Sequence, residues 1–460
     1  MFSWVTFETL QKWTGGTWSN ATLSDSVDSL STDTRSIQPG QVFLALRGEN
    51  FDGHRFLDSQ EVQRAAAVIV DQPYSGPIPS LQVQDTLQAL IQLGEGMRGS
   101  FQGKTLAVTG SAGKSSTKDM LATLCGDHTI KSPASFNNLI GVSKTALLLE
   151  DSTKTLVLEM GMNALGEISE LCSHFKPEFG LITNIGDAHI GKLGGLEFIY
   201  QAKKEMFDWL SESGGKAAVN IDDEKVVKAF RESYGSEPLV TYSALGKEAV
   251  VSILSSKLDP KTGFLNLEVK VRGERVSVAL PIFGKHQSQN IAAAIALAEL
   301  AGISQWHHQL PGIRPADHRG EVHLSPGGLT VIDESYNSNP TALKSSLDSL
   351  YELDPSLPKY VVLGEMLELG KFSESRHLEV GEYLATLQKR WGGDLTVFAY
   401  GQEAKGFLKP LAFMGDRCHF AESVSLIEAE LGQVRSAGWC LVKGSRGNRL
   451  EKVVNSLLHI

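Results

Sequence analysis

The residues with the clearest chemistry lie at positions 106–117, which read Leu-Ala-Val-Thr-Gly-Ser-Ala-Gly-Lys-Ser-Ser-Thr. An apolar run ends in a glycine turn, and a helical pattern follows it to about Leu124. This order directs backbone N–H groups and the positive end of a helix toward one point, where phosphate oxygens can be held. We expect Lys114 to reach the β- and γ-phosphates of a nucleotide and the Ser115 hydroxyl to bind the Mg²⁺ on them.

The glycine spacing in this segment, Gly-x-x-Gly-Lys-Ser, differs from the strict phosphate-loop pattern. That pattern requires a glycine five residues before Gly113, where this chain has Val108. The alternative interpretation is a helix that is merely capped by glycine and serine. Because the strand, the loop, the lysine-serine pair and the helix occur in the expected order, we favour the phosphate loop.

A Mg²⁺ ion on a nucleotide needs further ligands at the ends of neighbouring strands. Glu159 follows the apolar run 156–158, and His189 lies just past the run that ends at Gly186. Taken alone, a glutamate at a strand end is more often a surface carboxylate, and a single histidine is uninformative. Because both follow strands that come after a phosphate loop, we predict that they bind metal.

Apolar runs that alternate with helical segments surround these residues, an arrangement typical of a parallel sheet with crossover helices. The first series of runs is 105–110, 155–161, 179–186 and 216–220. An alternating, β-rich stretch and a helix at 289–300 follow. After a Gly- and Pro-rich stretch at 302–315, a second series is found at 330–333, 359–364, 396–401 and 439–444. Short strands at 41–46 and 65–70 and a helix at 86–97 come before both series.

These patterns predict an α/β protein of three domains, in agreement with a length of 460 residues. Residues 1–98 form a small α/β N-terminal domain. Residues 99–313 form a central ATPase-like domain with a parallel sheet of the phosphate-loop type, and residues 314–460 form a Rossmann-like C-terminal domain.

The charge of the chain excludes some partners. With 53 acidic and 43 basic side chains its formal net charge is -10, which argues against nucleic acid or anionic lipid as a main partner. The apolar run 291–298 is far shorter than the roughly 18 residues of a membrane helix, and no secretory signal is readable, so we expect a cytoplasmic protein. The four cysteines lie far apart, without zinc or disulfide spacing, and are expected to be buried thiols.

Together with the phosphate loop, three further segments resemble motifs of the Mur ligases, the ATP-dependent amide-forming enzymes of peptidoglycan precursor synthesis. In that family the phosphate loop has this Gly-x-x-Gly-Lys-[Ser/Thr] form. Residues 136–142 resemble the double-asparagine segment, and residues 201–207 resemble the segment whose lysine is carbamylated. Residues 284–290 match the Gly-x-His-x-x-x-Asn signature, in which the asparagine contacts adenine. The resemblance covers the whole chain.

Within the family, segments 333–340, 363–370 and 442–446 resemble stretches typical of the member that adds D-alanyl-D-alanine. The Asp-Asn-Pro-Arg tetrapeptide expected of the diaminopimelate-adding member does not occur in the sequence. Residues 31–35 and 48–54 resemble the uridine-nucleotide region that these two members share.

The resemblance implies a monomeric ligase of cell-wall biogenesis, linked to cell shape and division. It would activate UDP-N-acetylmuramoyl-tripeptide as an acyl phosphate and join it to D-alanyl-D-alanine, using ATP and two Mg²⁺ ions. The implied catalytic residues are Lys114, Glu159, His189 and Lys203. One ion would be held by Ser115 and Glu159, the other by His189 and carbamylated Lys203. From the residues alone, a solvated helix lysine beside Lys204 is the commoner interpretation of Lys203.

The remaining implied contacts fall into two sets. The ATP-binding residues are Gly110, Ser111, Ala112, Gly113, Lys114, Ser115, Ser116, Asn290, Arg319, Asp333 and Glu334. The substrate-binding residues are Ser31, Asp33, Thr34, Arg35, Asp52, Gly53, His54, Asn137, Asn138, Tyr336, Asn337 and Asn339. The C-terminal domain would bind D-alanyl-D-alanine and close over ATP. The alternatives are another amide ligase of this type that adds diaminopimelate or lysine, a folylpolyglutamate-type enzyme, a non-catalytic ATP-binding relative, and a plain ATPase or kinase.

Overall fold

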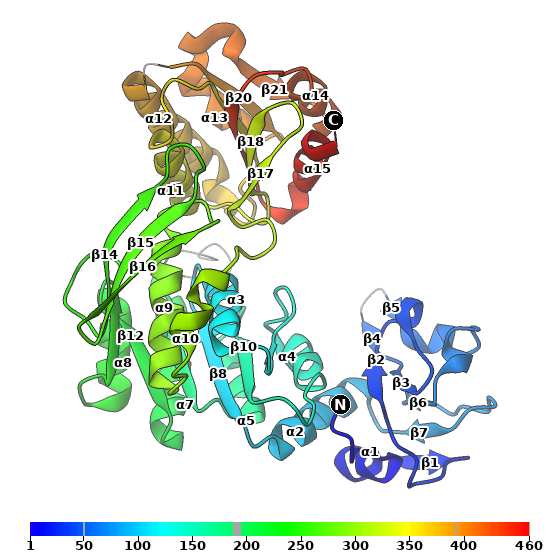
Figure 1. Ribbon diagram of the computed structural model, residues 1–460. Helices are drawn as coiled ribbons and strands as arrows, with labels where there is room; N and C mark the ends of the chain where they lie inside the picture. The colour runs from blue at the N-terminus through cyan, green and yellow to red at the C-terminus, as the bar shows by residue number, and fades with distance from the viewer. Residues whose placement is uncertain (49–50, 187–194, 392, 460) are drawn as a thin grey trace. The chain divides into compact units, whose positions relative to one another are not determined.

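The computed structural model describes residues 1–48, 51–186, 195–391 and 393–459 (Figure 1). Its helices and strands alternate as predicted, so the mixed α/β class is confirmed. By internal contacts the chain divides into two units. The first comprises Met1–Thr109, Cys125–Leu181 and Lys204–Ala217, and the second comprises Gly110–Leu124, Ile182–Lys203 and Ala218–Ile460. The predicted domain boundaries, after residues 98 and 313, do not coincide with the boundaries of these two units and stay predictions.

A five-stranded sheet in the order β1-β7-β6-β3-β2 forms the N-terminal region. Its strands are β1 (Thr17–Ser19), β2 (Ser29–Ser31), β3 (Gln41–Leu44), β6 (Ala67–Val70) and β7 (Ser80–Gln82), and β4 (Arg47–Gly48) and β5 (Phe51–Asp52) form a separate pair. The helices are α1 (Phe7–Thr14) and α2 (Thr86–Ser100). Helix α2 begins where the Asp85 carboxylate accepts the Gln88 N–H at 2.8 Å, since a side-chain cap satisfies an unpaired amide.

A nine-stranded sheet in the order β16-β15-β14-β13-β12-β11-β8-β10-β9 follows. Its strands are β8 (Lys104–Thr109), β9 (Thr129–Lys131), β10 (Thr155–Glu159), β11 (Phe179–Ile182), β12 (Lys216–Asn220), β13 (Val240–Ser243), β14 (Val251–Leu258), β15 (Leu265–Val271) and β16 (Glu274–Leu280). The helices are α3 (Lys114–Cys125), α4 (Leu139–Ala146), α5 (Glu167–Phe175), α7 (Leu196–Ser213), α8 (Glu224–Tyr234), α9 (Gln287–Leu300) and α10 (Trp306–Gln309). Strand β10 pairs in parallel with β8, so the carboxyl ends of both strands lie at one edge.

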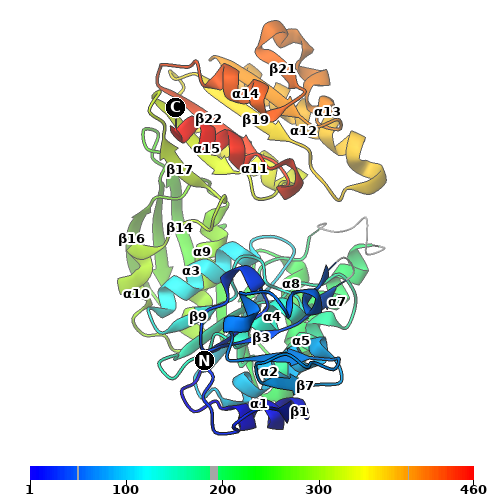
Figure 2. The same ribbon diagram turned by 90° about the vertical axis from the view of Figure 1, so that its right-hand side faces the viewer.

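A six-stranded sheet in the order β17-β18-β22-β19-β20-β21 forms the C-terminal region. Its strands are β17 (Glu321–Leu324), β18 (Leu329–Glu334), β19 (Lys359–Gly364), β20 (Leu395–Tyr400), β21 (Cys418–Ala421) and β22 (Gly438–Lys443). The helices are α11 (Pro340–Tyr351), α12 (Ser373–Trp391), α13 (Lys405–Leu408), α14 (Val424–Leu431) and α15 (Glu451–His459). Helix α12 packs against α11 and α13, whereas α14 and α15 pack against each other (Figure 2). Glu334 and Lys443 are partners in the parallel register of β18 and β22, so these two strands end side by side.

Two further expectations concern membranes and cysteines. Of the helices that the structure describes, none has the length and apolar character needed to cross a bilayer. All four cysteines are free thiols. Cys172 and Cys440 are buried as expected, but the expectation is wrong for Cys125 and Cys418, which are half-buried.

Candidate active site

Two positions of the phosphate loop need glycine, because neighbouring side chains leave no space for a Cβ atom. Gly110 has a φ of +147°, and a Cβ there would lie 1.8 Å from Thr183 Oγ1. Gly113 has a φ of +82°, and a Cβ there would lie 2.2 Å from Asn290 Oδ1. Positive φ and contact with a side chain both exclude a larger residue. Asn290, which the resemblance assigns to adenine, therefore packs directly against the loop.

The residues after β11 hold the loop in shape. Asn184 accepts the N–H of Ser111 on its backbone oxygen and the N–H of Ala112 on Oδ1, each at 3.0 Å. Thr183 Oγ1 donates to the Ala112 carbonyl at 2.6 Å. Because these two amides bond to Asn184, we expect phosphate to be held by the amides at the start of α3, which lack intrahelical acceptors. Thr183 and Asn184 were missed as site residues, although a Thr-Asn pair after a buried strand is a detectable signal.

Three side chains gather at the start of α3. Lys114 Nζ donates to the Gly110 carbonyl at 2.8 Å. Arg319 Nη2 donates to Ser115 Oγ at 3.2 Å, and its guanidinium lies 4.0 Å from the centre of the Tyr336 ring. The structure thus brings together two predicted ATP-binding cations and the hydroxyl predicted to bind Mg²⁺.

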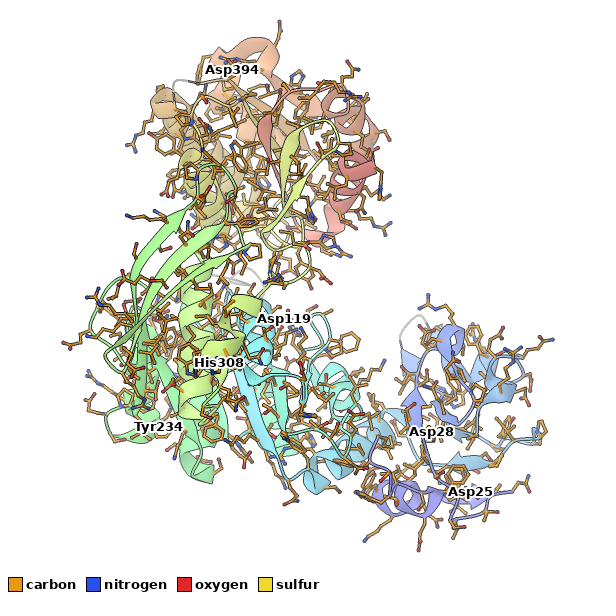
Figure 3. The ribbon with its side chains drawn as sticks, viewed as in Figure 1. Asp25, Asp28, Asp119, Tyr234, His308 and Asp394 are labelled. Carbon is orange, nitrogen blue, oxygen red and sulfur yellow. The ribbon has the colours of Figure 1, made fainter. Side chains whose placement is uncertain are left out.

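Helix α3 carries a further lysine on its buried side. Lys118 is 1% exposed, and its ammonium lies 3.1 Å from a carboxylate oxygen of Asp119, which Figure 3 labels on α3. A buried charge is retained only when it is paired. The positive charge of this helix is therefore not confined to Lys114.

Replacing Gly113 with alanine tests the packing of the loop. We expect Gly113→Ala to weaken ATP binding at least tenfold, because the new methyl group must displace Asn290. Gly166→Ala is the matched control, since Gly166 has a φ of +89° but nothing within 4 Å of its added Cβ. The control should lower the free energy of unfolding by about 1 kcal/mol through backbone strain alone and keep the ATP affinity. Calorimetric titration and thermal unfolding of both variants measure this, and equal ATP affinities would contradict it.

Lys203 is buried, so the interpretation as a solvated helix lysine is wrong. Its side chain is 4% exposed, and burial, followed by the positive charge of Lys114, holds its pKa well below the usual range for lysine. Lys204 instead forms an ion pair with Asp208 at 2.6 Å. The sequence contained the signal, because position 203 falls on the same helical face as the apolar positions 199, 206 and 210.

Glu159 ends β10, where its register partner on β8 is Val108. Its carboxylate is 1% exposed, and Oε1 accepts a hydrogen bond from Asn137 Nδ2 at 2.9 Å. Oε2 is buried and has no hydrogen-bond partner among the residues that the structure describes. A buried carboxylate oxygen without a partner is costly, so the environment of Glu159 suits a cation. His189, the other predicted strand-end ligand, lies outside the described residues.

The predicted uridine-nucleotide residues form two local clusters. Arg35 Nη2 lies 2.6 Å from an Asp33 oxygen, and hydrogen bonding to Arg35 lowers the pKa of Asp33 to about 2. This pair is exposed, with Thr34 beginning the short helix 34–36 and Ser31 accepting the Asp33 N–H. In the second cluster His54 is buried and its Nδ1 lies 2.8 Å from Asp52 Oδ1.

Space beside the second cluster is tight. A Cβ at Gly53 would lie 3.0 Å from the Ala45 Cα, so a side chain there would push against backbone. Asn138 and Asn339, also predicted to bind substrate, have structural roles as the caps of α4 and α11, where they accept backbone N–H groups at 2.9 and 2.8 Å.

The end of β18 is a buried polar network. Glu334 is 3% exposed and lies 3.1 Å from Lys443 Nζ. Burial alone would raise the pKa of Glu334, but Lys443 and His286 bring it below its usual value. Asp333 Oδ2 lies 2.7 Å from His318 Nδ1. Lys443 also donates to the Asn337 carbonyl at 3.3 Å; it lies within the motif 442–446 but was not predicted as a site residue.

Comparisons with known proteins place this arrangement in a family. Three family models match along the chain: "Mur ligase family, catalytic domain" at 26–93, "Mur ligase middle domain" at 108–298 and "Mur ligase, glutamate ligase domain" at 318–446. The UDP-N-acetylmuramoyl-tripeptide--D-alanyl-D-alanine ligase of Bacillus subtilis is 33% identical, over 94% of this chain and 93% of its own length. The chain belongs to the Mur ligase family. One family model falls within each of the three predicted domains, in agreement with the three-domain Mur ligase architecture.

Other Mur ligases resemble the chain over nearly its full length. The ligase of the same name from Escherichia coli is 31% identical and covers 94% of both chains. A crystal structure of MurF from Acinetobacter baumannii superposes with a TM-score of 0.86 at 30% identity and covers 99% of both chains. MurF from Thermotoga maritima, solved in complex with ADP, shares the fold with a TM-score of 0.78 at 24% identity, covering 94% of this chain and 97% of its own.

Proposed function

We propose that this Mur ligase is an ATP-dependent, ADP-forming ligase that joins D-alanyl-D-alanine to UDP-N-acetylmuramoyl-tripeptide. The product is the UDP-N-acetylmuramoyl-pentapeptide of cytoplasmic peptidoglycan synthesis. The observation that carries the proposal is the near full-length similarity to ligases of this name, at 33% and 31% identity. The phosphate loop and the cations around it supply the chemistry that such a reaction needs.

The positive charges around the loop follow from the reaction. Joining a carboxylate to an amine in water is unfavourable, so the carboxylate is first activated by phosphoryl transfer from ATP. This step brings a negative carboxylate against a negative triphosphate, and only a site rich in positive charge can hold both. In this proposal Lys114 and Arg319 neutralise phosphate oxygens, and the N-terminus of α3 binds them through its amides.

The proposal includes two Mg²⁺ ions. One ion would be held by Ser115 and Glu159. The Oε2 atom of Glu159 is buried and has no hydrogen-bond partner among the described residues. Lys203, as a carbamate, and His189 would hold the other. Bound Mg²⁺ supplies further positive charge against the phosphates and the attacking carboxylate.

Carbamylation of Lys203 requires a neutral amine. Burial lowers the pKa of this lysine, so the neutral form is present at lower pH than for a solvated lysine. A neutral amine can form an N–C bond with carbon dioxide and release a proton, which converts a cation into an oxygen ligand. Lys204 lacks this environment, because it forms an ion pair with Asp208.

Replacing Arg35 tests the proposed uridine-nucleotide site. We expect Arg35→Ala to weaken binding of the UDP-sugar peptide at least tenfold and to leave ATP affinity within twofold, because the two ligands are assigned to different domains. Arg64→Ala, at an exposed arginine of the same region, is the control and should change neither affinity. Titration of each variant with each ligand measures this. Equal losses for the two ligands would refute the assignment.

The product identifies the ligase. Incubation with ATP, Mg²⁺, UDP-N-acetylmuramoyl-tripeptide and D-alanyl-D-alanine should give a species whose mass equals the two substrates less one water. A diaminopimelate or lysine adder would instead extend the corresponding dipeptide precursor with a single amino acid. A non-catalytic relative would bind ATP and form neither product.

A further inference from the structure

Two arginines lie beside one tyrosine ring in the second unit of the chain. The guanidinium carbon of Arg319 lies 4.0 Å from the centre of the Tyr336 ring, and that of Arg446 lies 5.9 Å from the same centre. Arg446 belongs to the motif 442–446 and has no role in the function proposed above. We call Arg319 and Arg446 the arginine pair. It places two positive charges around a single side chain.

The positive charge of the arginine pair is poorly balanced. Among the residues that the structure describes, Arg446 forms one ion pair, with Glu451 at 3.6 Å from Nη1, and its guanidinium donates no hydrogen bond. In the same described part of the chain, the guanidinium of Arg319 forms no ion pair and donates only to Ser115 Oγ. Each guanidinium has five N–H donors, so the arginine pair can bind an anion with several oxygen atoms.

The backbone that carries Arg446 is held firmly, although its side chain is 57% exposed. Asn448 is buried, and its Nδ2 donates to the carbonyls of Glu365 at 3.0 Å and Ser445 at 2.9 Å. Asn448 Oδ1 accepts the Glu365 N–H at 3.0 Å. These bonds tie the turn after β22 to the residue that follows β19. The Arg446 guanidinium therefore extends from a fixed base, which a selective binding residue needs.

We propose that Arg446 binds the terminal carboxylate of the dipeptide acceptor. This inference rests on the proposed function, which supplies D-alanyl-D-alanine as the substrate. The planar fork of a guanidinium matches the two oxygens of a carboxylate, and this pairing is geometrically specific. Arg446 thus selects an acceptor that ends in a free carboxylate and discriminates against the amide of the same dipeptide, which lacks this charge.

The spacing of the arginine pair suits a dipeptide. The distances to the Tyr336 ring keep the two guanidinium carbons within about 10 Å of each other. An extended dipeptide measures about 7 Å from its amine to its carboxylate, and a paired carboxylate carbon lies about 4 Å from the guanidinium carbon. A dipeptide held by Arg446 can therefore place its amine beside Arg319. That arginine contacts Ser115 at the start of α3, where the acyl phosphate is expected.

The test compares D-alanyl-D-alanine with its C-terminal amide as acceptors for the full-length protein. Product formation with ATP, Mg²⁺ and UDP-N-acetylmuramoyl-tripeptide is followed by mass spectrometry, and kcat/KM is measured for each acceptor. Wild type should prefer the free dipeptide at least a hundredfold, because a site built to pair with a group rejects an analogue that lacks it. Arg446→Ala should lower this preference at least tenfold by losing activity toward the free dipeptide alone, and its KM for ATP should stay within twofold.

Arg417→Ala is the matched control. Its environment is similar, since the Arg417 side chain is 45% exposed and Nη1 lies 3.6 Å from the carboxylate of Asp394, which Figure 3 labels. This variant should keep the wild-type preference. Arg446→Lys keeps the charge but loses the planar fork, so its preference should fall between those of wild type and Arg446→Ala. A purely structural role of Arg446 would instead lower activity toward both acceptors equally.

Two results would overturn the inference while the proposed function stands. In the first, Arg446→Ala keeps the wild-type preference or loses activity equally toward both acceptors. In the second, its KM for ATP rises at least tenfold with the preference unchanged, which would assign Arg446 to the nucleotide. If Arg446→Ala does not fold, Arg446→Lys decides, and an unchanged preference contradicts the inference. A wild type that forms no product from D-alanyl-D-alanine would refute the proposed function and this inference with it.

Discussion

Lys114→Ala is expected to fold like the wild type and to lose ligation activity by about a hundredfold or more. Removing one preorganised donor from developing negative charge typically costs about 10² to 10³ in rate. Lys114 stands at the start of α3, where its ammonium reaches the Gly110 carbonyl at 2.8 Å, so the change removes charge from the loop and no apolar core residue. Initial rates of phosphate release at saturating substrates measure the effect.

Two controls separate charge from folding in this experiment. Thermal unfolding should show a midpoint close to that of the wild type, and Lys228→Ala, at an exposed lysine of α8 that pairs with Glu232, should keep the full rate. A Lys114→Ala variant that keeps more than about a tenth of the wild-type rate would rule out the proposed role, because the contact should be worth several kcal/mol.

Lys203→Ala is expected to lose nearly all activity and to recover part of it when acetate or another short carboxylic acid is added. A carbamylated lysine presents oxygen ligands with negative charge, and a small carboxylate can supply the same chemistry in the vacated space. Because the Lys203 side chain is 4% exposed, its replacement by alanine leaves a buried cavity that can hold a small anion. Activity against acetate concentration measures the rescue, with chloride at equal ionic strength as the control.

Lys204→Ala is the matched variant for this prediction. It removes a lysine from the neighbouring position of α7, where the ammonium pairs with Asp208 at 2.6 Å, and it should stay active. If Lys204→Ala is the inactive variant, or if amines restore Lys203→Ala and carboxylic acids do not, Lys203 acts as a cation and the carbamate assignment is wrong.

The phosphate loop could be predicted because its signal is local. A strand, a glycine turn and a helix within twelve residues define β8, the loop and the start of α3, and the structure has them where the pattern indicated. The contacts of Asn184 with Ser111 and Ala112 could not be predicted in this way. They depend on β11 lying beside β8 in the sheet, although about 70 residues separate the two strands, and hydrophobic periodicity gives no strand order.

The contact between Glu334 and Lys443 at the end of β18 could not be predicted for the same reason. Glu334 and Lys443 are more than a hundred residues apart and become neighbours only through the parallel register of β18 and β22. The burial of Lys203, in contrast, could have been predicted from the apolar face of α7. The adjacent Lys204 instead favoured the interpretation as a solvated pair of lysines. Boundaries were the least precise predictions: the predicted strand 179–186 ends at Ile182, because Thr183 and Asn184 turn to bond the loop.

ATP cleavage by this chain should depend on a dipeptide acceptor. The most direct measurement is phosphate release with UDP-N-acetylmuramoyl-tripeptides that end in diaminopimelate or in lysine, each with and without D-alanyl-D-alanine. Release should be slow without the dipeptide and rise at least a hundredfold when it is added to the accepted tripeptide, with one phosphate per molecule of product. Phosphate release at the same rate with and without D-alanyl-D-alanine would contradict the proposed ligase function and indicate an ATPase.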